Sequence, residues 1–158
     1  EIDAQEIEKI AISSTKIRNS INQGELETTK KYLGRFFSLT GKVVKGDGLG
    51  KQLDYPTANI LIEEDYKIIP KDGVYYIRTT IDNKLYNGMM NIGHRPTIGN
   101  KAKSIEVNLF NFDRDIYDKV ISVEVVVKIR DEKKFSSINA LKAQLAKDEE
   151  HCLKLINK

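Results

Sequence analysis

The sequence predicts a mainly β fold, a closed or nearly closed antiparallel barrel with one helix packed on it. Three observations predict it. Short runs rich in β-branched and aromatic residues alternate with turn signals through the middle of the chain. The last of these runs is followed by a segment with helical periodicity, and the chain of 158 residues has the length of one ordinary domain.

The chain begins with a segment of helical character that reaches about Gly34. Apolar residues recur at helical intervals from Ile7, and the hydroxyls of residues 13–15 offer an N-cap for a second helical run toward Gly24. Residues 25–33 are expected to form a further short helix that ends at Gly34.

The region that follows has the pattern of strands, which are expected over residues 36–45, 74–81, 85–92, 104–110 and 120–130. The second and third of these form a hairpin around the turn Asp82-Asn83-Lys84. Over 104–110 polar and apolar residues alternate, so Glu106 and Asn108 share the polar face. The last strand alternates most clearly, and its apolar face consists of Ile121, Val123, Val125, Val127 and Ile129.

A closing amphipathic helix is expected after Ser136 and Ser137, which supply capping hydroxyls. Its apolar stripe consists of Ile138, Leu141, Leu145, Cys152 and Ile156. Because Cys152 falls on this stripe, we expect it to pack in the core and not to act as a nucleophile.

Composition restricts the classes of function. The net charge is only +3 and the charges are scattered, which is compatible with anionic small molecules and does not indicate nucleic-acid binding. Cys152 is the only cysteine, which indicates a reducing compartment, the cytoplasm, with no disulfide framework or cysteine metal cluster. No apolar run approaches the ~20 residues of a membrane span, so neither export nor insertion is expected. The first residue is Glu1 and not Met, so part of the natural protein is expected to be missing.

A glycine-rich segment, Gly46-Asp47-Gly48-Leu49-Gly50-Lys51, follows the first strand. Alternate glycines let the backbone approach a ligand and turn its amides toward phosphate oxygens. One interpretation is therefore a flap over a nucleotide, and the alternative is a flexible hairpin tip. The segment is neither a Walker A loop nor a dinucleotide fingerprint, because the spacing differs from both.

Two further positions offer oxygen ligands and a base. Thr57 and Asn59 lie two apart on a strand and point the same way, and their oxygens suit Mg²⁺, although two solvated polar residues would have the same pattern. Glu106 would serve as the base for a substrate hydroxyl, and its alternative is an ordinary surface carboxylate. His94 and Arg95 are secondary candidates for phosphate contact or for loop stabilisation.

Taken in order, six segments closely resemble the riboflavin kinase family: 41–51, 55–59 (Tyr-Pro-Thr-Ala-Asn), 72–75, 91–97 (Asn-Ile-Gly-His-Arg-Pro-Thr), 105–109 (Ile-Glu-Val-Asn-Leu) and 130–135 (Arg-Asp-Glu-Lys-Lys-Phe). The resemblance runs from about Arg35 to the end. Residues 12–18 look like the closing motif of the FMN adenylyltransferase domain that precedes the kinase in bacterial bifunctional enzymes.

The resemblance implies a six-stranded antiparallel barrel of Greek-key type over 35–158, with residues 1–34 as the remnant of the preceding domain. It implies transfer of a phosphoryl group from ATP to riboflavin, with FMN and ADP as products. Glu106 would be the catalytic carboxylate, and Thr57 and Asn59 would hold Mg²⁺. The nucleotide would contact Gly46, Gly48, Lys51, Thr57, Asn59, Leu109 and Asn111, and the flavin would contact Arg130, Lys133 and Phe135.

The sequence departs from the family pattern at Asn108, where histidine is usual, and at Arg114, where glycine is usual, which leaves the local geometry open there. It also has no His-x-Gly-His motif, so the chain as it stands is expected to lack adenylyltransferase activity. Two alternatives to a kinase remain. One is a non-catalytic flavin- or nucleotide-sensing module, and the other is an RNA-binding barrel, for which no clustered basic and aromatic surface is found. The expected partners are small molecules, with no nucleic acid and no membrane.

Overall fold

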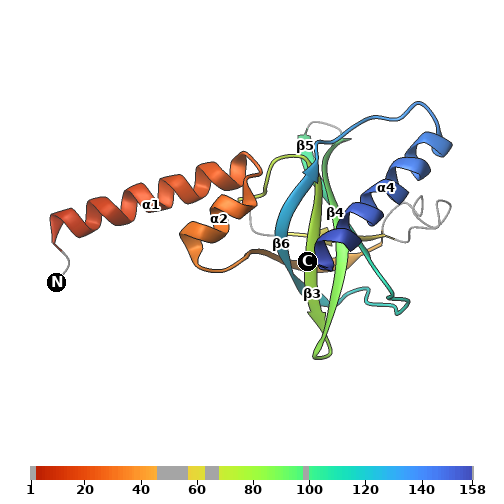
Figure 1. The fold of residues 1–158 in the computed structure, drawn as a ribbon, viewed down its shortest axis with the longest axis horizontal. Coiled ribbons are helices and arrows are strands. Elements are labelled where there is room, and N and C mark those ends of the chain that lie inside the picture. The colour runs from red at the N-terminus through yellow and green to blue at the C-terminus, as the bar shows by residue number, and fades with distance from the viewer. Residues whose placement is uncertain (1–2, 46–56, 63–67, 98–99, 158) are drawn as a thin grey trace.

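The computed structural model describes residues 3–45, 57–62, 68–97 and 100–157. Its helices and strands are, in order, α1 (Ala4–Asn22), α2 (Leu26–Leu33), β1 (Phe37–Val44), β2 (Ala58–Leu61), β3 (Gly73–Ile81), β4 (Lys84–Thr97), β5 (Asn100–Leu109), β6 (Val120–Arg130) and α4 (Ile138–Ile156). The strands close into an antiparallel barrel in the order β1-β2-β5-β4-β3-β6, with α4 against its outside (Figure 1). The predicted fold class, a six-stranded antiparallel barrel with a C-terminal helix, is confirmed.

The hairpin between β3 and β4 forms where the turn was predicted. Ile81 and Lys84 are register partners, so the turn is the two residues Asp82 and Asn83, with φ of 50° and 65°. Positive φ at both positions is the type I′ geometry, whose twist matches that of the flanking strands. Asp and Asn adopt this conformation at lower cost than other non-glycine residues.

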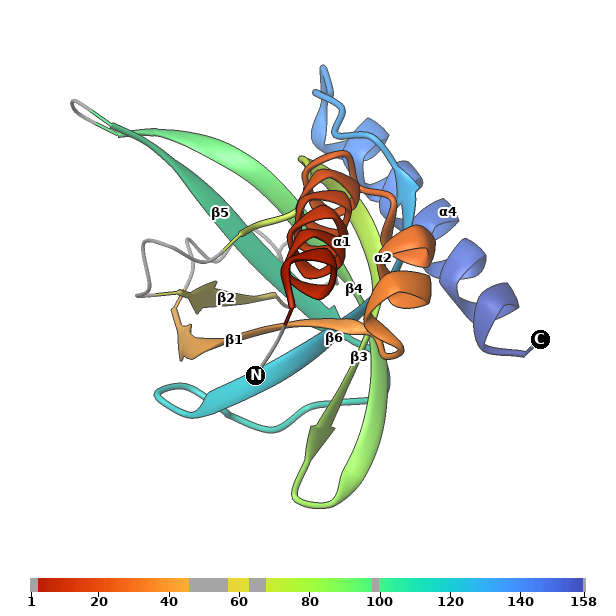
Figure 2. The ribbon, with the colours of Figure 1, turned by 90° about the vertical axis from the view of Figure 1, so that its left-hand side faces the viewer.

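β4 is longer than predicted. Among the described residues, its backbone beyond Ile92 pairs only with β5, and the two strands continue beyond the barrel as a two-stranded arm (Figure 2). Gly93 and Pro96 are residue types typical of loops. They are accommodated because a strand with a partner on one side only tolerates a residue that cannot donate to a second ladder.

The barrel has an apolar core inside and a second apolar cluster outside, under α4. Leu39, Tyr75 and Val123 are among the fully buried residues of the inner core. The outer cluster contains Val74, Tyr76, Met89 and Cys152, which anchors α4 to the outer face of the barrel. Cys152 is fully buried there, so the prediction that it serves packing is confirmed.

β6 corrects the predicted apolar face of the last strand. Its register against β3 shifts between Tyr76 and Ile77, so that Val125 pairs with Ile77 and Val127 with Tyr76. The extra residue of this bulge reverses the alternation. Val125 therefore faces the inner core, whereas Val127 and Ile129 pack in the outer cluster under α4. Simple alternation placed all of them on one face.

The predicted N-cap of α4 is confirmed at Ser137, whose hydroxyl accepts a hydrogen bond from the Ala140 amide at 3.1 Å. At the other end of the chain, residues 13–15 do not cap a second helix, because α1 runs through them to Asn22. The interruption comes instead at Gly24, where φ is 76°, a conformation that glycine adopts without strain.

α2 is part of the packed barrel. Leu26 is 1 % exposed and belongs to the inner core, and the Ser20 and Thr29 hydroxyls form a buried hydrogen bond of 2.7 Å between the two helices. α1 extends away from the barrel on the far side from α4 (Figures 1 and 2). No helix in the described part of the chain is long and apolar enough to cross a membrane.

Truncating Leu26 to alanine is expected to lower the free energy of unfolding by about 2–5 kcal/mol, because it leaves a cavity in the core. Tyr32→Ala on the same helix, where the side chain is 47 % exposed, is expected to cost no more than about 0.5 kcal/mol. Urea denaturation of both variants measures the difference. Equal stabilities would mean that α2 is not integrated into the barrel.

Candidate active site

Three polar residues lie side by side across neighbouring strands. Asn59 of β2 is the register partner of Glu106 of β5, and Glu106 is in turn the partner of Asn91 of β4. Directly opposed residues in antiparallel strands project from the same face with Cβ atoms about 4.5–5.5 Å apart. The carboxylate of Glu106 therefore lies between two carboxamides, in what we call the polar row (Asn59, Glu106, Asn91).

The polar row lies on the outer face of the barrel. Its sequence neighbours Ile60, Ile105 and Val107 point inward and are buried in the inner core. Asn91 is also the partner of Val74, which belongs to the outer cluster under α4. The polar row therefore continues along the outer face toward the part of the barrel that α4 covers.

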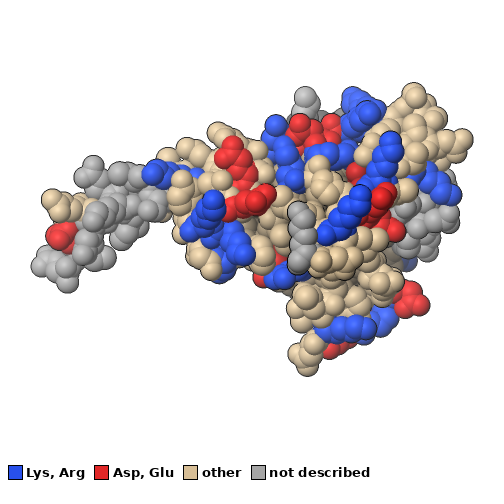
Figure 3. Space-filling model, in the orientation of Figure 1, with Lys and Arg blue, Asp and Glu red and all other residues tan. Residues whose placement is uncertain are grey.

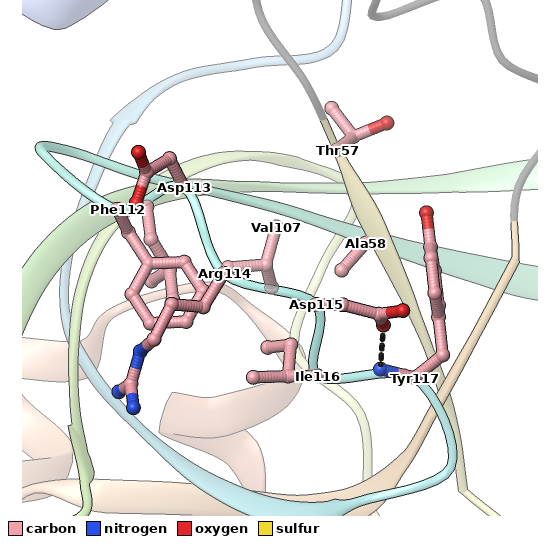
Figure 4. A pocket seen from close by; sticks show the side chains of 10 residues that line it. Thr57, Ala58, Val107, Phe112, Asp113, Arg114, Asp115, Ile116 and Tyr117 are labelled. Atoms are coloured by element: carbon pink, nitrogen blue, oxygen red, sulfur yellow. Dashed lines mark hydrogen bonds between the residues drawn. The ribbon is translucent and has the colours of Figure 1, made fainter.

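A pocket of about 420 Å³ opens at the inner side of the same two strands (Figure 4). It is lined by Thr57, Ala58, Val107, Leu109 and residues 112–117. Ala58 and Val107 are register partners, immediately next to the pair Asn59 and Glu106. The pocket and the polar row thus lie on the two faces of one strand pair, and Thr57, one residue before β2, lies at the rim of the pocket.

Some of the predicted nucleotide contacts lie in the described part of the structure and others do not. Leu109 lines the pocket, and Asn111, with φ of 55°, is exposed in the turn just after β5. Gly46, Gly48 and Lys51 lie outside the described residues. The roles of all these residues stay predictions.

The predicted flavin contacts lie together at the end of β6. The guanidinium carbon of Arg130 is 5.8 Å from the centre of the Phe135 ring, and the Lys133 ammonium is 5.7 Å from the same ring. Arg130 also forms an ion pair with Asp148 of α4, at 2.8 Å. The structure brings the three residues together, and their contact with a flavin stays a prediction.

Glu132 brings a second carboxylate close to the polar row. The Glu132 carboxylate packs directly on Gly93, so closely that a side chain at this position would collide with it. Gly93 lies two residues after Asn91, on the same face of β4. Burial, followed by the nearby Asp72 carboxylate, raises the pKa of Glu132 above its usual range.

His94 contacts a different partner. Its Nδ1 atom forms a hydrogen bond with the Asp72 carboxylate, and the Lys103 ammonium donates to the Pro70 carbonyl at 2.8 Å. Both contacts hold the segment before β3 against the β4–β5 arm. This favours the loop-stabilising alternative for His94, and the side chain of Arg95 lies outside the described residues.

The two departures from the family pattern are accommodated. Arg114 donates to the Asp82 carboxylate at 2.7 Å and lies over the Phe112 ring, and it is not among the described residues with positive φ, so this position does not require glycine. Asn108 is buried on the outer face, opposite Met89.

Sequence reasoning assigned no role to Asn91, Glu132 or Asp148. Asn91 carries the clearest signal, because it is a carboxamide between Met90 and Ile92 in a strand. Glu132 and Asp148 lie in charged stretches typical of solvent-exposed surface, and only their contacts in the fold distinguish them.

Comparison with known proteins gives one consistent result. Residues 33–156 match the profile of the Flavokinase (riboflavin kinase) family. The bifunctional riboflavin kinase/FMN adenylyltransferase of Bacillus subtilis is 37 % identical over 146 residues, and that of Buchnera aphidicola subsp. Schizaphis graminum is 41 % identical over 152 residues. The alignments cover 90 % and 94 % of this chain, but 46 % and 48 % of those proteins. The chain thus spans about half the length of the curated relatives it matches.

The chain is also similar to solved structures. A Streptococcus pneumoniae protein described as a macrolide-efflux protein has a TM-score of 0.81 and 36 % identity, over 87 % of this chain and 45 % of its own. A Trypanosoma brucei riboflavin kinase has a TM-score of 0.53 and 25 % identity, over 77 % of this chain and 80 % of its own. Since the family profile covers the barrel and α4, the chain that carries the polar row belongs to the riboflavin kinase family.

Proposed function

We propose that this chain is the riboflavin kinase module of a bifunctional enzyme and that it transfers the γ-phosphoryl group of ATP to the ribityl 5′-hydroxyl of riboflavin, giving FMN and ADP. The observation that carries the proposal is the register pair of Asn59 and Glu106, next to a pocket in the same strands. The match over residues 33–156 supports it. We place the reaction in the cytoplasm, in keeping with the single buried cysteine.

The pocket is the proposed site of the adenine base. It is lined largely by apolar and aromatic side chains such as Leu109, Phe112 and Tyr117. A base held here by these side chains and by backbone groups near Leu109 and Asn111 would direct its phosphates past Thr57 to the outer face. Gly46, Gly48 and Lys51 are proposed to contact those phosphates through backbone amides and the ammonium group.

The donor atoms at residues 57 and 59 fit magnesium. A hydroxyl and a carboxamide oxygen are hard ligands, and Mg²⁺ takes its remaining ligands from water and substrate phosphates. The described residues contain no group of three or more His, Cys, Asp or Glu side chains that would hold a metal ion by themselves. Bound between Thr57, Asn59 and the phosphates, the ion would neutralise charge that develops during transfer.

Glu106 is proposed to accept a hydrogen bond from the ribityl 5′-hydroxyl and to aim its oxygen at the γ-phosphorus. Phosphoryl transfer through a loose transition state depends mainly on alignment and charge neutralisation. Because an alcohol is a poor acid, the proton would move to the carboxylate late in the reaction. Glu106 therefore acts first by orienting the nucleophile and then by taking its proton.

The flavin ring is proposed to lie toward Arg130, Lys133 and Phe135. Register pairs connect Glu106 through Asn91 and Val74 to Arg130, which is three strands from Glu106 along the outer face. At the usual strand spacing this is about 14 Å. A ribityl chain alone is shorter than this, so the flavin ring would span the remainder, with its far edge near Phe135 and the ribityl 5′-hydroxyl at Glu106.

The decisive experiment is an assay of the purified chain with riboflavin, ATP and Mg²⁺, in which FMN is separated from riboflavin by chromatography. Formation of FMN and ADP in equal amounts is expected. Riboflavin binding without FMN formation would instead favour the non-catalytic sensing module.

We further propose that FAD formation belongs to a preceding adenylyltransferase domain that ends within residues 1–34, with the kinase domain over 35–158 and α2 packed on its barrel. The names and lengths of the curated relatives support this division. Incubation of this chain with FMN and ATP is expected to give no FAD. An RNA-binding function is not favoured, because basic and acidic side chains are interspersed on the face shown in Figure 3.

A further inference from the structure

A buried ion pair joins α4 to the end of β6. The Arg130 Nε atom donates to both carboxylate oxygens of Asp148, at 2.8 and 3.0 Å, and its Nη2 atom donates to Oδ2 at 2.8 Å. Gln144, one turn earlier on α4, donates to Oδ1 at 2.9 Å. Asp148 is only 3 % exposed, and its carboxylate is well supplied with donors.

This ion pair also fixes the start of the segment that follows β6. The remaining terminal nitrogen of Arg130, Nη1, donates to the Asp131 carbonyl at 3.1 Å, and the guanidinium lies 5.8 Å from the Phe135 ring centre. Arg130 therefore contacts both ends of residues 131–135, the backbone carbonyl of Asp131 and the ring of Phe135. We call these residues the rim segment.

The rim segment is held at a second point, beside the polar row. Glu132 packs on Gly93, which lies two residues from Asn91 on the same face of β4. The segment is thus attached to α4 through Arg130 and lies against β4 through Glu132. A displacement at the Arg130 end would change where Lys133 and Phe135 lie relative to Glu106.

A gain in folding stability does not by itself explain why a buried ion pair lies at this position. Replacing a buried ion pair by apolar residues of similar volume is often neutral or stabilising, because desolvation offsets the attraction. What the pair provides is geometry, since a guanidinium with both edges engaged has one orientation. Asp148 also neutralises the charge of Arg130. The guanidinium beside the rim segment therefore has a fixed orientation but carries little net charge together with its partner.

We propose that Asp148, supported by Gln144, is a positioning residue for riboflavin: it orients Arg130 from α4 and thereby sets the position of the rim segment relative to the polar row. The inference rests on the proposed function and adds to it a determinant of flavin affinity that touches no substrate. It assigns α4 a part in positioning the flavin besides covering the outer apolar cluster.

The test is Asp148→Asn, which keeps the shape of the side chain and removes its charge. The KM for riboflavin, and the Kd from quenching of flavin fluorescence without ATP, are expected to rise roughly ten- to a hundredfold. The KM for ATP is expected to stay within about twofold, since the nucleotide pocket lies at the inner side of β2 and β5. Glu150→Gln is the matched control, because Glu150 is exposed and pairs with exposed Lys154 on the same helix.

Two further variants keep the inference testable if Asp148→Asn folds poorly. Gln144→Ala leaves the ion pair intact, and a rise of about two- to fivefold in the riboflavin Kd is expected from one lost hydrogen bond. The double variant Q144E/D148N exchanges the carboxylate and the amide, and it is expected to recover part of the lost affinity.

An unchanged riboflavin Kd in folded Asp148→Asn would overturn the inference, as would equal rises in both KM values. A wild-type chain that binds riboflavin but forms no FMN would contradict the proposed kinase activity. The positioning role would still be tested by comparing the riboflavin Kd of Asp148→Asn with that of the wild type. The two failures are therefore distinguishable.

Discussion

Glu106→Gln is expected to reduce the rate of FMN formation by about 10²–10⁴-fold while the barrel stays folded. Glutamine occupies the same space between Asn59 and Asn91, but it cannot accept the proton of the ribityl hydroxyl. The side chain projects from the outer face and contributes nothing to the inner core. The measurement is kcat at saturating riboflavin and ATP, with circular dichroism as the check on folding.

Glu124→Gln on β6 is the matched control. Glu124 is also a half-exposed strand carboxylate, and it pairs with Arg78 at 3.0 Å, away from the polar row. Its kcat is expected to equal that of the wild type. Full turnover in Glu106→Gln would show that the base lies elsewhere.

Removal of divalent metal by chelation is expected to stop the reaction, and Asn59→Ala is expected to raise the Mg²⁺ concentration for half-maximal rate by about 10–100-fold. The reason is that the proposed metal ion, held by two protein oxygens and the substrate phosphates, would lose one of its few fixed ligands. Titration of the rate with Mg²⁺ at constant total ATP measures the shift. Thr57→Ala should shift the same titration in the same direction.

Asn22→Ala, at the end of α1, controls for the loss of a carboxamide outside the site. Its Mg²⁺ titration is expected to match that of the wild type. An Asn59→Ala variant with an unchanged titration would remove Asn59 from the proposed ligand set, whatever its effect on kcat.

Alternation and turn residues were enough to predict most of the barrel, because each strand has one face in a core. The exception is informative. The register of β6 against β3 shifts twice, and after the shift between Tyr76 and Ile77 both Val127 and Ile129 pack in the outer apolar cluster. Both clusters require apolar side chains. Since the residue types are the same on either side of a bulge, hydrophobic pattern alone cannot locate it.

The site was predictable residue by residue but not as an arrangement. Spacing predicted that Thr57 and Asn59 share a strand and a direction, but β2 begins at Ala58 and Thr57 lines the pocket at the inner side, away from the face of Asn59. The pairing of Asn59 with Glu106 depends on the register between distant strands, which spacing does not give. The role of Asp148 could not be predicted from the sequence for another reason. This residue begins a run of three acidic residues on a helix, and only the contact with Arg130 separates it from the two that follow.

The location of Cys152 makes it a natural reporter of helix detachment. The thiol is sealed between α4 and the barrel wall, and burial, with Asp148 and Glu149 next in effect, raises its pKa to about 12. At neutral pH it therefore reacts with a thiol reagent only when α4 lifts away and the thiol regains water. Because the chain has one cysteine, the labelling rate reads out that opening without an introduced probe.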